Sequence, residues 1–316
     1  MGIESSATLN YQLTTFAQGH MNDLADARAL AERLAPSTPV PGSNGQFKKF
    51  NDKNSFLPED TSRALGGDPK LIATSASDDT YSCKPQALEV RVDQAEIDAA
   101  GSGAGALGQQ LLREGKVAAL LNKAALSHSV QVVTAVLAAV TPQPSLGVWS
   151  DPTVDPIDQL DSQLLALSND CGSATNIKLT IDVGAWSALR SHPLVKKRCE
   201  GVQVGGITRE QLASLLLFPV DVFIATLVKD TAGFGLAPNK ARVIASEALL
   251  HYSVPNATLY DPSPFKTFTV GMGSPFSGVR SYQAPNGLWE GHLIDWSRDI
   301  KQTSTLAMRR ITVTGN

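Results

Sequence analysis

The chain has 316 residues, of which 42% are hydrophobic and 18% charged, a composition typical of a globular protein with one large core or two smaller ones. Its formal net charge is −3 and it has no basic run, which argues against tight binding of nucleic-acid phosphates. The three cysteines, Cys83, Cys171 and Cys199, are too widely spaced for a zinc site or a disulfide framework and suit a reducing cytoplasm.

The first 36 residues predict an N-terminal arm. A polar stretch is followed by Asn22, which can cap a helix that Pro36 ends. The apolar face of this helix carries four residues: Leu24, Ala27, Ala31 and Leu34. One amphipathic helix cannot bury its own apolar face, so we expect residues 1–36 to lack a core of their own.

Residues 37–86 are rich in Pro and Gly and predict a projecting β-hairpin. Short strand-like runs, 46–50 and 80–83, lie between the turn residues, and the apolar content is too low for a separate core. Ordering such a segment is costly unless a partner surface receives it. The run 46–50 alternates aromatic and basic residues. We therefore expect Phe47 and Phe50 to anchor on a neighbouring molecule, with Lys48 and Lys49 meeting its acidic groups.

The next segment predicts a strand at 87–92 and an unusually long helix at 104–140. Thr141-Pro142 ends the helix, and Gly115 or Ser127 could bend it. The length of the helix suggests a central element on which other parts are mounted.

Residues 146–252 predict a compact α/β unit. Asp155 and Pro156 begin a helix that closes at Cys171-Gly172, and Thr208 with Gln211 forms a capping box for another. A short helix is predicted at 183–191, and strands are predicted at 176–181, 220–228 and 243–252. The remaining residues are rich in strand patterns, at 265–270, 279–283, 288–296 and 310–314.

One glycine-rich run resembles a dinucleotide-binding motif. Gly103–Gly108 matches G-x-G-x-x-G before a helix, but 93–100 looks helical rather than β, and no acidic residue follows at the required distance. A flexible entry to the long helix explains these glycines better. The five histidines are scattered without metal-ligand spacing, so the sequence predicts no catalytic, cofactor or metal site.

Several phrases resemble the major capsid proteins of tailed bacteriophages, which have the Hong-Kong-97-type capsid fold. They occur in order along the chain at 40–50, 60–69, 81–89, 148–152, 184–190, 229–232 and 295–297. The resemblance implies an α+β fold with five parts: an N-terminal arm (1–36), an extended-loop β-hairpin (37–86), a peripheral domain with a spine helix (87–145), an axial domain (146–252) and return strands mainly in the peripheral domain (253–316). The expected inter-subunit contacts in the extended loop are Phe47, Lys48, Lys49, Phe50, Asp60 and Arg63.

The resemblance also implies a function without catalysis. The chain would self-assemble as pentamers and hexamers of an icosahedral shell around packaged double-stranded DNA, contacted non-specifically. Further partners would be a portal and any decoration or scaffolding protein. A scaffolding protein would be a separate chain, because the extended loop begins too near Met1 for a fused scaffolding segment. Assembly would take place in the bacterial cytoplasm and end in the virion. Two alternatives remain: an encapsulin-like shell with protein cargo, and a nicotinamide-dependent enzyme built on Gly103–Gly108.

Overall fold

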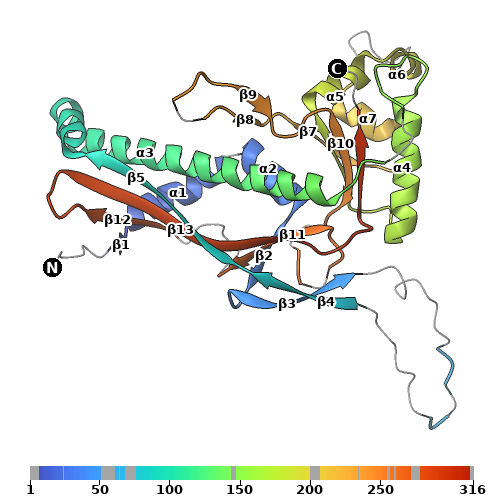
Figure 1. Ribbon diagram of the computed structural model, residues 1–316, viewed down its shortest axis with the longest axis horizontal. Helices are drawn as coiled ribbons and strands as arrows, with labels where there is room; N and C mark the ends of the chain where they lie inside the picture. Colours follow the sequence, from blue (N-terminus) through green and yellow to red (C-terminus); the bar gives the residue numbers. More distant parts are fainter. Residues whose placement is uncertain are drawn as a thin grey trace.

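The computed structural model describes residues 7–23, 25–50, 61–63, 65–67, 76–143, 147–199, 207–233, 235–254, 257–259, 261–271 and 278–313. Over these residues the chain is an elongated α+β molecule with a large sheet towards one end and a smaller sheet at the other (Figure 1). A pair of strands projects from one side of the body (Figure 1).

The 14-residue strand β13 (Trp289–Gln302) organises the larger, six-stranded sheet. One edge of β13 pairs antiparallel with all ten residues of β5 (Lys84–Asp93). The other edge pairs with β12 (Val279–Gln283) in its first part and with β11 (Phe265–Val270) in its second. Two short strands extend the sheet beyond β12 and β11: β1 (Thr8–Leu9) and β2 (Ser37–Val40).

The long helix α3 (Gln94–Ala139) follows β5 directly and packs against this sheet. The Asp93 carboxylate accepts a hydrogen bond from the backbone N–H of Ala95 at 2.8 Å, which caps the first turn. The helix begins ten residues before the predicted start and bends at Gly105 rather than at Gly115 or Ser127. Gly105 has φ 59° and ψ −142°, a conformation that is unfavourable for residues with a Cβ atom and accessible to glycine. The glycine run therefore lies inside a helix, which does not fit the strand–turn–helix order of a dinucleotide site.

The N-terminal residues form two helices, α1 (Tyr11–Asp23) and α2 (Ala25–Leu34), which lie along α3. The first was not predicted. Their apolar faces are buried against α3 and the large sheet, with Leu30 and Leu34 fully enclosed. This segment has no separate core, but it completes the core of the body, because α3 presents an apolar face that needs covering.

The smaller sheet has the strand order β14-β10-β6-β7, with only β6 and β7 parallel. Its strands are β6 (Ile177–Asp182), β7 (Asp221–Ala225), β10 (Glu247–Tyr252) and β14 (Met308–Thr312). The helices of this unit are α4 (Pro156–Cys171), α5 (Val183–Ser191), α6 (Pro193–Arg198) and α7 (Arg209–Leu215). Its core is mainly aliphatic and includes Trp149. Ile311 of β14 belongs to the same core, so a strand from the C-terminal end of the chain completes the predicted α/β unit.

Local signals placed most of these elements correctly. Asp155 caps α4, Gly172 ends it with φ 64°, and Thr208 forms the predicted capping box with Gln211. Two predicted strands are shorter than expected. The run 220–228 divides into β7 and β8 (Val228–Asp230), which forms a hairpin with β9 (Lys240–Arg242). The predicted strand 243–252 is shortened to β10, which begins at Glu247. The preceding residue, Ser246, has φ 54°, and this conformation interrupts extended backbone.

Arg33 joins α2 to the smaller sheet. Its guanidinium donates to the Leu179 carbonyl at 3.3 Å and to the Thr180 hydroxyl at 3.2 Å, and it pairs with Asp221. The imidazole of the fully buried His251 donates to the Arg33 carbonyl at 2.9 Å. Burial lowers the pKa of His251 well below its ordinary value, so the neutral ring stays beside the arginine.

The bend at Gly105 gives the first testable prediction. Gly105→Ala should lower the free energy of unfolding by about 1–3 kcal/mol, because alanine is strained at this φ although no atom crowds the site. Gly115→Ala, in the regular and open part of the same helix, should raise it by about 0.4–1 kcal/mol. Urea denaturation measures both, and two changes of the same sign would contradict the assigned bend.

A second prediction concerns acid stability. Burial, with the nearby charges of Arg298 and Arg28, lowers the pKa of His128 to about 3. The unfolded chain binds this proton near pH 6.5, so acid favours unfolding, and stability is lost as the pH falls from about 6.5 towards the folded pKa, by at most about 1.4 kcal/mol per pH unit. His128→Gln should reduce the slope of the unfolding free energy against pH below about pH 6.5. Equal slopes in the variant and the unmodified protein would contradict the burial argument.

Candidate functional site: a projecting hairpin and a polar pocket

The projecting strands are β3 (Asn44–Phe50) and β4 (Ala76–Ser82), which pair antiparallel over seven residues. They form a two-stranded sheet outside the larger one, and Figure 1 shows them pointing away from the body. Both strands lie where the sequence predicts strand structure. An isolated two-stranded sheet is marginally stable in water, so its base needs support from the rest of the molecule.

Aromatic packing supplies that support, and it corrects the prediction for Phe47. Its side chain is 3% exposed, and its ring centroid lies 5.1 Å from that of Phe268 on β11. Tyr81 of β4 stacks on the same Phe268 ring at 4.9 Å. A Cβ atom at Gly45 would lie 2.3 Å from the Tyr81 hydroxyl, so glycine leaves room for this ring. Phe47 is therefore a core residue of its own chain, and the expectation that it anchors on a neighbour is wrong.

The other predicted contact residues differ in their surroundings. Lys48 is exposed and pairs with Asp78 across the hairpin at 2.5 Å, so its acidic partner lies in the same chain. An exposed pair of this kind contributes only about 0–1 kcal/mol. Lys49 is half-buried and Arg63 is exposed. The side chain of Phe50 and the whole of Asp60 lie outside the described residues.

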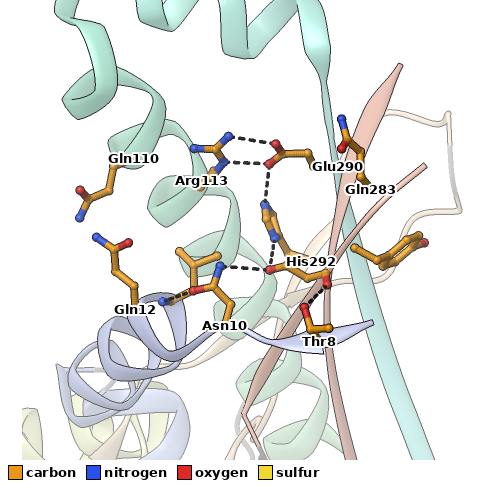
Figure 2. A pocket seen from close by; sticks show the side chains of 11 residues that line it. Thr8, Asn10, Gln12, Gln110, Arg113, Gln283, Glu290 and His292 are labelled. Atoms are coloured by element: carbon orange, nitrogen blue, oxygen red, sulfur yellow. Dashed lines mark hydrogen bonds and ion pairs between the residues drawn. The ribbon is translucent and has the colours of Figure 1, made fainter. Parts of the chain in front are cut away.

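A polar pocket of about 400 Å³ lies at the end of the molecule far from the smaller sheet, between α1, α3, β12 and β13 (Figure 2). No sequence motif indicated it, because its residues come from four separate parts of the chain. It is lined by Thr8, Asn10, Gln12, Leu13, Gln110, Arg113, Ser281, Tyr282, Gln283, Glu290 and His292.

A hydrogen-bonded network forms one wall of this pocket (Figure 2). The Arg113 guanidinium donates two bonds to the Glu290 carboxylate, at 2.8 and 3.0 Å. His292 Nδ1 lies 2.8 Å from the Ser281 hydroxyl, which also accepts a bond from the Asn10 amide at 3.4 Å. Burial lowers the pKa of His292, and the Arg113 charge acts in the same direction while Glu290 opposes it. The wall is thus polar, with its one permanent positive charge compensated.

No group of three or more His, Cys, Asp or Glu side chains in the described part of the chain is arranged to hold a metal ion. The cysteines are free, and burial raises the pKa of Cys171 to about 11, which keeps that thiol protonated and unreactive. None of the described helices is long and apolar enough to cross a membrane.

Comparison with known proteins gives a result only at the level of structure. No protein-family model and no curated protein sequence matches the chain. Its structure, however, resembles that of a phage-related protein from Bordetella bronchiseptica RB50, with a TM-score of 0.71, 20% identity and 98% of each chain covered. A putative prophage capsid protein from E. coli CFT073 matches with a TM-score of 0.57 and 10% identity, covering 98% of this chain and 100% of the other. A virus-like particle from Pyrococcus furiosus matches at 0.52 and 12% identity, covering 95% and 97%.

The chain therefore has the phage major capsid protein fold, as its sequence predicted. The likeness extends over nearly the whole of each chain, so it concerns the complete arrangement and not one shared motif. The helix and sheet content agrees with the predicted α+β class. The exact domain boundaries stay predictions.

The corrected role of Phe47 yields a third prediction. Phe47→Ala should destabilise the unassembled protein by about 3–5 kcal/mol, since a buried aromatic ring is lost and a cavity remains. Lys48→Ala, at the next position on the exposed face, should change the free energy of unfolding by about 0–1 kcal/mol. Urea denaturation of the unassembled protein measures both. Unchanged stability of Phe47→Ala, together with loss of assembly, would restore the neighbour-anchoring interpretation.

Proposed function

We propose that this protein is the major capsid subunit of a tailed bacteriophage, a non-enzymatic protein of which many copies form a closed shell. The observation that carries the proposal is the likeness to a phage-related protein over 98% of both chains with a TM-score of 0.71. The putative prophage capsid protein, matched over 98% of this chain, supports the same function.

The shape of the molecule supports assembly. The hairpin β3–β4 rests on an aromatic base and projects from the body (Figure 1). Ordering a projecting segment costs conformational entropy, which contacts with another molecule can offset. A rigid body with a projecting hairpin can repeat the same contacts in every copy, so a small gain per contact is multiplied over the shell.

In this proposal the same chain occupies pentamers and hexamers of an icosahedral shell that encloses double-stranded DNA. The net charge of −3 favours loose, non-specific contact with the DNA. Further partners are a portal and a separate scaffolding or decoration protein. Assembly takes place in the host bacterial cytoplasm, and the product is the virion.

A protein compartment of the encapsulin type is the second candidate. The specific observation in its favour is the match to the virus-like particle from Pyrococcus furiosus. Both candidates require a closed shell, so they differ in contents. Nucleic acid inside particles isolated from the natural source supports the phage capsid, and protein cargo without nucleic acid supports the compartment.

The fourth prediction tests the shared requirement. The protein, expressed with its genomic neighbours, should sediment as megadalton particles that negative-stain electron microscopy shows to be closed shells. Thiol titration of the denatured particles should find the three cysteines reduced, in line with assembly in a reducing cytoplasm. A monodisperse monomer under all conditions would contradict the proposal.

A further inference from the structure

We infer that a small monovalent anion, chloride in ordinary buffers, binds beneath α3 between Arg298 of β13 and Thr269 of β11. The inference goes beyond the proposed function and does not depend on it, because the site lies inside one copy of the chain. It is carried by a buried guanidinium that has no acidic partner among the described residues.

The surroundings of Arg298 leave its charge uncompensated. The residue is 3% exposed, and its Nη2 donates to the side-chain oxygen of Gln131 on α3 at 2.9 Å. The Nε and Nη1 groups are buried, and neither has an acceptor among the described residues. Burial lowers the pKa of Arg298 to about 10, so the guanidinium still carries its charge at neutral pH. A buried charge without a counter-charge is strongly unfavourable.

Other positive charges surround this guanidinium. Lys84 of β5 lies directly opposite Arg298 in the strand register, so both side chains leave the sheet on the same face. Like charges directly opposite one another in a sheet are unfavourable. Arg28 of α2 adds a third charge, and together with Arg298 it lowers the pKa of the buried His128. The electrostatic potential between α3 and the sheet is therefore positive here, which favours an anion.

Thr269 supplies a further hydrogen-bond donor. It lies opposite Arg298 on the other edge of β13, where directly paired residues have Cβ atoms about 4.5–5.5 Å apart on one face. Its hydroxyl is buried and has no partner among the described residues. The Thr267 hydroxyl, on the same face, is by contrast bonded to the Ala35 carbonyl at 3.1 Å and lies 3.4 Å from His128 Nε2. Two N–H groups and one hydroxyl without acceptors therefore share one place in the core.

A small anion fits these donors better than a water molecule does. Water can accept from the donors, but it leaves the guanidinium charge uncompensated. Chloride accepts from all of them and supplies the missing negative charge. The Trp296 ring, 5.4 Å from Arg298 Cζ, and the side chains of α3 enclose the site. Strongly hydrated anions such as fluoride or sulfate lose more on leaving water, so we expect chloride and bromide to be preferred.

Gln131 gives the site a route to solvent. It is exposed although its side-chain oxygen bonds to Arg298, so the guanidinium lies one side chain below the surface of α3. Exposed side chains change rotamer within picoseconds to nanoseconds, and such a movement of Gln131 uncovers Arg298. Lys84, exposed beside the same strand, attracts anions to this entrance. The bound anion then holds β11 and β13 together beneath α3.

Urea denaturation of the unassembled full-length protein at varied chloride concentration tests the inference. Urea is the denaturant because guanidinium chloride would add the ligand, and sodium fluoride keeps the ionic strength constant. Above the dissociation constant, the folding equilibrium constant should rise about tenfold for each tenfold rise in chloride. Bromide should act like chloride. A folding equilibrium constant that does not respond to either halide would overturn the inference.

Three variants assign the chloride effect to this site. Arg298→Met keeps an apolar side chain in the core and removes the charge, so the chloride dependence should disappear. Gln131→Glu places a carboxylate beside the guanidinium from an exposed position and should weaken the dependence several-fold. Arg280→Met, the matched control at an exposed arginine of β12 that pairs with Asp295, should keep it. An equal chloride dependence in all the proteins would show a general salt effect and overturn the inference.

Anomalous diffraction from crystals of the unmodified protein grown in bromide locates the anion directly, so the test stands even where Arg298→Met fails to fold. We expect a bromide peak within hydrogen-bond distance of Arg298 Nε and Thr269 Oγ1, and a weaker peak or none in Gln131→Glu. Bromide found only on exposed groups, or a water molecule at Arg298 in place of the halide, would overturn the inference.

Discussion

Backbone pairing along the whole of β13 is the constraint on which the rest of the structure depends. Its 14 residues pair with β5 on one edge and with β12 and then β11 on the other. The strand β5 leads directly into α3, β11 carries Phe268, and β12 carries part of the pocket. A one-residue shift in the β13 register would turn every buried side chain on it to the opposite face, so the register is strongly fixed.

The hairpin proposed for assembly and the polar pocket both follow from this arrangement. The hairpin β3–β4 takes its position from Phe268, and the Ser82 N–H donates to Asp299 of β13 at 2.8 Å. The pocket is held by Arg113 of α3 and Glu290 of β13, which bring helix and sheet together at the far end of the body. The smaller sheet is tied to the same body through Arg33. The hairpin is therefore displayed by a rigid framework and can repeat its contacts from copy to copy.

Sequence reasoning succeeded where the signal is local. The caps at Asp155 and Thr208 and the long apolar period of α3 depend on residues within a few turns of one another, and the structure has them. It failed where the answer depends on distant residues. Phe47 looks like an exposed anchor until Phe268 is placed beneath it, and the pocket is assembled from segments at both ends of the chain. The helix α1 was missed because its apolar positions are few and are covered only by distant parts of the chain, α3 and the large sheet.

Hydrogen exchange of the unassembled and assembled protein tests the central claim most directly: a body fixed by β13 presents a hairpin that assembly buries. The amides of β13 that pair with β5 should exchange slowly in both states, because they open only when the body unfolds. The amides of the outer part of β3–β4 should gain protection only in particles. Rapid exchange along β13 in the unassembled protein, or unchanged exchange of the hairpin in particles, would contradict this account.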